Sequence, residues 1–144
     1  MSDLEKKQRE LVIKIARSWL RTPYQHRQQI RGAGVDCAMF PLAVYHEAGL
    51  INAIEIPPYP PDWHLHKSVE VYLGIVESVA KEIFREPQPA DFVLYQYGRC
   101  WSHGAIVIKW PLVIHSVHPH GVIFANGEIE GCIVGRKRRL FSIW

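Results

Sequence analysis

Cysteine is scarce in this sequence, and its spacing does not suit a disulfide framework. The 144 residues contain three cysteines, Cys37, Cys100 and Cys132, an odd number at wide spacing. Small secreted domains need paired cysteines, so we expect reduced thiols, although one bridge between two of the three stays open. The core must then come from apolar packing, and an apolar content of 48% is enough for this length. We expect a single domain over residues 1–144.

The sequence also lacks a long apolar run and a strong excess of one charge. No window approaches the roughly 20 apolar residues that span a bilayer. The first 20 residues mix charged with apolar side chains and contain no uninterrupted apolar region of the kind found in a signal peptide. We therefore expect a soluble chain that is made in the cytoplasm and does not insert into a membrane.

The net charge is only +3, and a basic run at 135–139 supplies much of it. Such a run can touch phosphates or an acidic polymer, but a solvated strand end is the preferred interpretation. No nucleic-acid partner is expected.

Two helices are predicted in the first third of the chain. Apolar residues recur three or four apart between residues 4 and 20, and Ser2 with Glu5 fits a capping box at the start of this helix. A second helix is predicted over residues 37–48, with Asp36 as an N-cap candidate and a stop at Gly49.

The rest of the chain changes from one further helix to short strands. Apolar spacing predicts a helix over residues 63–85. From Asp91 onward, short β-branched or aromatic runs alternate with Gly, Pro and Asn, which is typical of an antiparallel meander. The runs are FVLYQY, GAIVIKW, LVIHSV, GVIFAN and RLFSIW. This order predicts an α+β domain in which N-terminal helices pack on a C-terminal antiparallel sheet of about five strands.

Eight histidines raise the question of a metal site. His64 and His66 are two residues apart, as are His118 and His120, and this spacing puts both imidazoles on one side only in a strand. Neither pair stands near a Cys-x-x-Cys or His-Glu-x-x-His element. We therefore expect neither a metal nor another cofactor.

Two other histidines belong to predicted strands. If residues 104–109 and 112–117 form a hairpin about the KWP turn, His103 and His115 become neighbours. A thiol nucleophile needs a base within hydrogen-bond reach and a polar group that orients the base. Neutral imidazole can accept a proton near pH 7 without a large change in its pKa. The histidine pair is therefore suited to serve a cysteine nucleophile.

The stretch GAGVDCAMF at residues 32–40 contains the best candidate for that nucleophile. Gly32 and Gly34 relax the backbone before Cys37, and a helix N-terminus favours the thiolate over the thiol. Taken alone, the stretch fits a buried apolar cysteine as well as a nucleophile. Cys100, in a predicted loop, and Cys132, in a predicted strand, are interpreted as small buried hydrophobic residues.

Three segments together resemble the NlpC/P60 cysteine peptidases over roughly residues 11–125: TPYQH with GVDCAMF, ADFVLYQY with SHGAIVI, and VIHS. The resemblance implies a papain-like α+β fold with a thiol nucleophile at a helix N-terminus. It makes Cys37 the nucleophile, His103 the general base and His115 the orienting residue. It also places Tyr24 near the nucleophile, where its hydroxyl helps to hold the oxyanion.

Two residues flanking this set are candidates for binding a substrate ammonium, namely Asp36 and Ser102. For each, helix capping or a backbone hydrogen bond is the alternative. The chain also departs from the family's pattern, with DCAM where Asp-Cys-Ser-Gly is common and HGA where His-Val-Gly is common. The shape of the substrate groove therefore does not carry over.

The resemblance implies a peptidoglycan hydrolase that cuts stem-peptide amide bonds between D-γ-glutamyl and a diamino acid. The segments PPYPPDWHLH and YLGIV resemble phage tail-associated members. This implies a virion component that has tail or tail-tip proteins as partners. A phage or phage-like particle would carry it to the periplasm or cell wall of the target cell. The alternatives are a structural tail-tip protein with an occluded or inactive peptidase fold, and an amidase or acyltransferase on the same scaffold.

Overall fold

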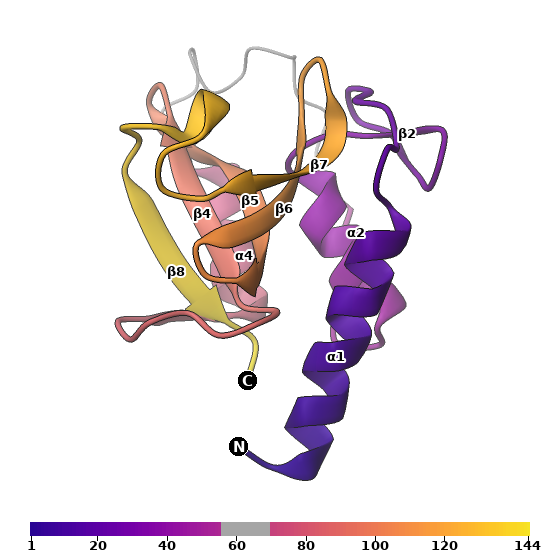
Figure 1. Ribbon diagram of the computed structural model, residues 1–144, viewed down its shortest axis with the longest axis vertical. Coiled ribbons are helices and arrows are strands. Elements are labelled where there is room, and N and C mark those ends of the chain that lie inside the picture. The colour runs from indigo at the N-terminus through magenta and orange to yellow at the C-terminus, as the bar shows by residue number, and fades with distance from the viewer. Residues whose placement is uncertain (56–69) are drawn as a thin grey trace.

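The computed structural model describes residues 1–55 and 70–144, which form helices and a six-stranded antiparallel sheet (Figure 1). The helices are α1 (Asp3–Ser18), α2 (Met39–Glu47), α4 (Val71–Val79) and a short 3-10 helix, η1 (Gly131–Ile133). The sheet strands are β3 (Lys81–Ile83), β4 (Phe92–Tyr97), β5 (Cys100–Lys109), β6 (Leu112–Val117), β7 (Gly121–Asn126) and β8 (Arg138–Ser142). Strands β1 (Gln29–Ile30) and β2 (Gly34–Val35) form a separate small hairpin. The predicted α+β class is confirmed.

The first two helices begin and end where their signals predict, to within two residues. The Ser2 hydroxyl accepts a hydrogen bond from the backbone N–H of Glu5 at the start of α1. Gly49 follows α2 with a φ of 76° and donates its N–H to the carbonyl of His46. Glycine adopts this left-handed conformation without a steric penalty, so α2 stops there.

The predicted helix over residues 63–85 is wrong at its C-terminal end. Residues 56–69 lie outside the described part of the chain, so only the part from Val71 can be compared. Helix α4 ends at Val79, Ala80 is extended, and Lys81–Ile83 forms strand β3 against β8. Glu82 accepts two hydrogen bonds from the Arg139 guanidinium across this pair. Pairing with a strand 57–61 residues away therefore overrides the helical spacing.

The sheet is not the simple meander that the strand order predicts. Strands β4 to β7 do follow one another, but β8 returns to pair with β4 and separates it from β3. All five predicted strand segments are present, and β3 is the additional one. Figure 1 shows β8 next to β4, with the two chain ends on the same side of the molecule.

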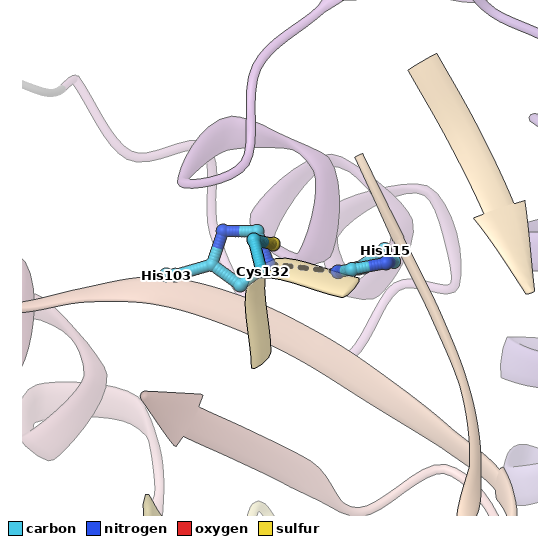
Figure 2. Close-up of side chains that lie close together, drawn as sticks. All are labelled: His103, His115 and Cys132. Atoms are coloured by element: carbon cyan, nitrogen blue, oxygen red, sulfur yellow. Dashed lines mark hydrogen bonds between the residues drawn. The ribbon is translucent and has the colours of Figure 1, made fainter. Parts of the chain in front are cut away.

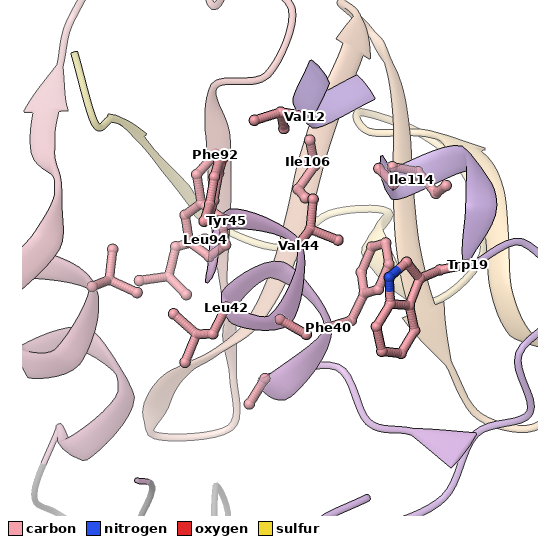
Figure 3. Packing of buried hydrophobic residues seen from close by; sticks show 14 of the residues in the cluster. Val12, Trp19, Phe40, Leu42, Val44, Tyr45, Phe92, Leu94, Ile106 and Ile114 are labelled. Atoms are coloured by element: carbon pink, nitrogen blue, oxygen red, sulfur yellow. The ribbon is translucent and has the colours of Figure 1, made fainter. Parts of the chain in front are cut away.

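The two faces of the sheet bury different partners. On one face, Phe92, Ile106 and Ile114 pack against α1 and α2 residues such as Val12 and Val44 (Figure 3). The opposite face buries a smaller cluster around Val93, Tyr95, Ala105, Val107 and Val113 under Ile133 of η1. Each fully buried aliphatic side chain stabilises the fold by about 1.5–3 kcal/mol relative to exposure. Side chains alternate along a strand, so His103 and His115 share the second face.

Among the described residues, no helix combines the length and the apolar character needed to cross a membrane.

Candidate active site

A cavity of about 420 Å³ opens where the loop before α2 meets the beginning of β5. Five of the six residues singled out from the sequence line it: Tyr24, Asp36, Cys37, Ser102 and His103. The sixth, His115, does not line the cavity and lies behind His103. The fold therefore gathers all six predicted residues into one region from positions as far apart as 24 and 115.

Cys37 lies two residues before the first residue of α2 and is half-buried. Its sulfur is 3.9 Å from the Tyr24 hydroxyl, which donates to it, and 3.7 Å from the backbone carbonyl of Ser102, which accepts from it. Gly34 makes this approach of the loop feasible, because a Cβ there would lie 2.6 Å from the Gln25 side chain. Gly32 instead supplies a φ of 79°.

Asp36 is buried and caps the start of α2. Its carboxylate accepts hydrogen bonds from the backbone N–H groups of Ala38 and Met39, at 3.2 and 2.9 Å, and from that of Arg27 at 2.8 Å. The capping role is confirmed, although the helix begins two residues later than predicted. Contact with a substrate ammonium stays a prediction.

A β-bulge positions Ser102. His103 pairs with Tyr95 and Trp101 pairs with Gln96, so Ser102 is the extra residue between them. A bulged residue leaves the regular hydrogen-bond ladder. Its carbonyl is thus available to accept from the Cys37 thiol. The serine is buried, and a substrate contact through its hydroxyl stays a prediction.

The predicted hairpin forms, and it joins the two histidines directly. Strands β5 and β6 pair in a register that includes Ile106 with Ile114. His103 Nε2 and His115 Nδ1 share a hydrogen bond of 2.8 Å, with the two rings perpendicular. Tyr97 also stacks on the His103 ring, with ring centroids 4.8 Å apart. The His103 ring is therefore held in one orientation by partners from β4 and β6.

A helix N-terminus favours a thiolate, but the surroundings of this site favour the neutral form of each titratable group. Burial, reinforced by the Asp36 carboxylate, raises the pKa of the Cys37 thiol to about 12. Burial and the neighbouring His115 hold the pKa of His103 well below 6.5, and burial lowers that of His115 to about 4. Removal from water disfavours the charged form of each group. The site thus holds a neutral thiol and two neutral imidazoles near pH 7.

The structure adds residues that the sequence did not single out. Tyr97, Cys132 and Arg136 line the same cavity. Cys132 lies half-buried in η1, so its predicted place in a strand is wrong, as is its interpretation as a buried hydrophobic residue. Cys100, in contrast, is fully buried, as predicted. It is the first residue of β5, so its predicted place in a loop is wrong. The alternation of Tyr95 and Tyr97 in YQY was the available signal for Tyr97.

One group of side chains has the composition of a metal site. Ligand atoms of His103, His115 and Cys132 all lie within 4.8 Å of one another (Figure 2). The histidine pairs that the sequence analysis considered as metal ligands contain none of these three residues. His118 lines the cavity and contacts the Tyr24 ring edge-on, whereas His64 and His66 lie outside the described residues.

Several solved structures that resemble the chain are NlpC/P60 domains. The NlpC/p60 domain of the peptidoglycan hydrolase SagA is 16% identical with a TM-score of 0.62, over 92% of this chain and 97% of that one. The peptidoglycan hydrolase RipB from Mycobacterium tuberculosis is 14% identical with a TM-score of 0.63, over 99% and 68% of the two chains. The P60 domain of an antigen from M. avium paratuberculosis is 14% identical with a TM-score of 0.57, over 94% and 92%.

No family model matches the chain, and no curated protein matches it. At these identities the structural likeness establishes the fold, which is the mixed α+β fold of NlpC/P60 domains. Function has to be argued from the site itself.

Proposed function

We propose that the chain is a cysteine peptidase that hydrolyses amide bonds in the stem peptides of peptidoglycan. The observation that carries this proposal is the His103–His115 hydrogen bond of 2.8 Å beside a cavity that Cys37 also lines. A nucleophile, a base and a group that orients the base are the parts that thiol catalysis of acyl transfer requires. The NlpC/P60 fold supports the same reaction class, because SagA and RipB are both peptidoglycan hydrolases.

The proposed reaction requires one of the two possible donor directions of the hydrogen bond between the histidines. If His103 donates from Nε2 to His115 Nδ1, its own Nδ1 is left with a lone pair that can accept the proton of Cys37. Because thiol and imidazole are both neutral at rest, proton transfer accompanies the attack of sulfur on the amide carbon. The amine leaves with the proton from His103, and water then attacks the thioester and releases the acid.

The oxyanion requires hydrogen-bond donors on the cavity side of Cys37. The N–H groups of Ala38 and Met39 are already bonded to Asp36, so they do not serve this purpose. The Cys37 N–H and the Tyr24 hydroxyl, which donates to the Cys37 sulfur, are the donors proposed to hold the oxyanion. Asp36 therefore acts mainly by fixing the helix start that presents Cys37.

The finer assignment rests on the sequence resemblance. We propose the bond between D-γ-glutamyl and the diamino acid as the target, with Asp36 and Ser102 near the substrate ammonium. The segments PPYPPDWHLH and YLGIV support a phage or phage-like tail component, with tail or tail-tip proteins as partners. The enzyme would then act in the periplasm or cell wall of the target cell.

Mass spectrometry of muropeptides tests nucleophile, substrate and bond in one experiment. Wild-type protein is expected to split stem peptides between D-γ-glutamyl and the diamino acid. Cys37→Ala is expected to lower the rate by about 10⁴-fold or more, because it removes the group that forms the covalent intermediate. Thermal unfolding of the variant establishes that the loss is chemical.

Cys100→Ala is the matched control. It also removes a thiol, but from a buried position on β5 that does not line the cavity. Its rate should stay within a few-fold of wild type. A folded Cys37→Ala protein with the wild-type rate would rule out the proposed mechanism. Absence of cleavage by folded wild type, together with a stable complex with tail proteins, would favour the structural tail-tip alternative.

A further inference from the structure

Cys132 stands next to the two histidines, although no step of the proposed hydrolysis uses it. Ligand atoms of His103, His115 and Cys132 lie within 4.8 Å of one another. Figure 2 shows the Cys132 sulfur beside the His103 ring, on the same side as the bond to His115. We propose that these three side chains bind a divalent transition metal ion of the zinc class, and that the bound ion switches off hydrolysis.

The donor set suits such an ion. Two imidazoles and one thiolate are ligands that Zn²⁺ prefers, and three protein ligands leave a fourth position for water. Bond lengths of about 2.0–2.3 Å put neighbouring ligand atoms in a tetrahedral site roughly 3.3–3.7 Å apart. The two histidine nitrogens are 2.8 Å apart, so they must separate slightly, and the sulfur, which lies within 4.8 Å of both, must approach by at most about 1 Å. The ion takes the place of the proton that the histidines share.

The surroundings of Cys132 hold its sulfur beside the histidines. The Tyr97 hydroxyl donates to its sulfur at 2.6 Å. The Arg136 guanidinium lies 3.6 Å from the centre of the Tyr97 ring, and its Nε donates to the Cys132 carbonyl at 2.6 Å. These contacts fix the direction of the side chain, as outer partners do in metal sites.

Occupation of the site is incompatible with the base role of His103. This part of the inference rests on the proposed function. A neutral imidazole has one lone pair, so coordination through Nε2 leaves the proton on Nδ1. Nδ1 can then no longer accept the proton of Cys37. The ion also breaks the hydrogen bond to His115, so both histidine contributions to the proposed catalysis are lost together.

Cobalt(II) is the probe for binding, because its bonds to thiolate and its tetrahedral geometry both give visible or near-ultraviolet absorption. Purified, metal-free, reduced protein is titrated with Co²⁺. Wild type and Cys37→Ala are expected to develop a sulfur-to-cobalt charge-transfer band at one equivalent, and Cys132→Ala is expected to lack it. Zn²⁺ should then displace Co²⁺ and bleach the spectrum. This readout does not depend on hydrolysis.

Two results would overturn the site. One is a wild-type protein that gives no charge-transfer band, and the other is a band that survives in Cys132→Ala but disappears in Cys37→Ala. The regulatory part is tested with the muropeptide assay, where Zn²⁺ at saturation should lower the wild-type rate at least tenfold and EDTA should restore it. Cys132→Ala should need at least tenfold more Zn²⁺ for the same inhibition. Equal sensitivity of both proteins would overturn the regulation, whereas an inactive wild type that still binds Co²⁺ would count against the proposed hydrolase alone.

Discussion

At the scale of single residues, His115 is the group whose role is most sharply defined by geometry. It does not line the cavity, and its Nδ1 shares a hydrogen bond with Nε2 of His103. A residue in this position orients the base and selects its tautomer without touching substrate. In the proposed mechanism it is a positioning residue.

Substitution of His115 distinguishes an acceptor from a mere space filler. Asn places an amide oxygen close to the position of Nδ1, so His115→Asn is expected to keep most of the wild-type kcat. His115→Ala removes the acceptor and is expected to lower kcat by about 10–100-fold, with little change in KM. Steady-state kinetics on a synthetic stem peptide provides the measurement. Equal losses in both variants would contradict the positioning role.

Much of the site could be predicted from the sequence because its parts sit on regular elements. His103 and His115 lie on the two strands of one hairpin, which the turn between them brings together. Cys132 could not be placed in this way, because η1 belongs to a long connection between β7 and β8 with no periodic pattern. A helix N-terminus by itself favours the thiolate form of Cys37. Burial depends on the whole surrounding fold, and here it outweighs the helix terminus.

At the scale of elements, the contact between β5 and its neighbours depends on Gly104. A Cβ at this position would lie 2.6 Å from the Phe92 ring and 2.9 Å from the Tyr72 hydroxyl. Tyr72 in turn donates to the carbonyl of Ala38, next to the nucleophile. The departure from the family's His-Val-Gly pattern thus has a local steric reason.

Gly104→Ala is expected to destabilise the protein and to displace the site. Overpacking of this kind costs about 1–3 kcal/mol of the free energy of unfolding, measured by urea denaturation. Gly74→Ala in α4 is the control, because a Cβ there meets no atom within 4 Å and alanine is the better helix former. The control should gain up to about 1 kcal/mol. Equal stability of the two variants would show that β5 adapts to the added methyl group.

The helices could be predicted where local sequence signals define their ends. The strands could not be placed where they pair with residues far away in the sequence. The capping box and the terminal glycine locate α1 and α2 from local residues alone. Strand β3 follows α4 after one extended residue, and only its pairing with β8 makes it a strand. The position of β8 beside β4 has the same cause, because nothing in RLFSIW specifies which edge it joins.

At the scale of the whole molecule, the two sheet faces combine stability with the proposed chemistry. The helix-covered face carries the larger apolar cluster, while the second face buries the two histidines beside a smaller one. Arg9 of α1 forms an ion pair with the buried Asp91, just before β4, and its guanidinium also lies over the ring of Trp144 after β8. Helix α1 therefore contacts the chain on both sides of the segment β4–β8. Burial of neutral histidines in such a fold makes its stability sensitive to acid.

The free energy of unfolding is expected to fall as the pH falls from 6.5 toward 4. In the unfolded chain a histidine binds its proton near pH 6.5, whereas burial lowers the folded pKa of His115 to about 4. The unfolded state therefore binds more protons in this window, and stability increases with pH across it. His115 alone accounts for about 3 kcal/mol, and His103 acts in the same direction.

Urea denaturation at intervals between pH 7 and pH 4.5, with EDTA present, measures this dependence. His115→Asn should flatten the curve, and His120→Gln, which alters an exposed histidine, should leave it unchanged. A wild-type free energy that stays constant down to pH 5 would contradict burial of the histidines in the neutral form.

The protonated state of Cys37 also bears on how the protein responds to thiol reagents. Alkylating agents react with the thiolate, and a pKa of about 12 leaves on the order of one thiolate in 10⁵ molecules at pH 7. Iodoacetamide at neutral pH is therefore expected to label Cys37 far more slowly than free cysteine, as followed by peptide mass spectrometry. Labelling as fast as free cysteine would show that the thiolate forms without substrate. The Ser102 carbonyl accepts a hydrogen bond from the Cys37 thiol, which also favours slow labelling. Activity-based probes for the proposed peptidase should therefore carry a substrate-like peptide rather than rely on intrinsic thiol reactivity.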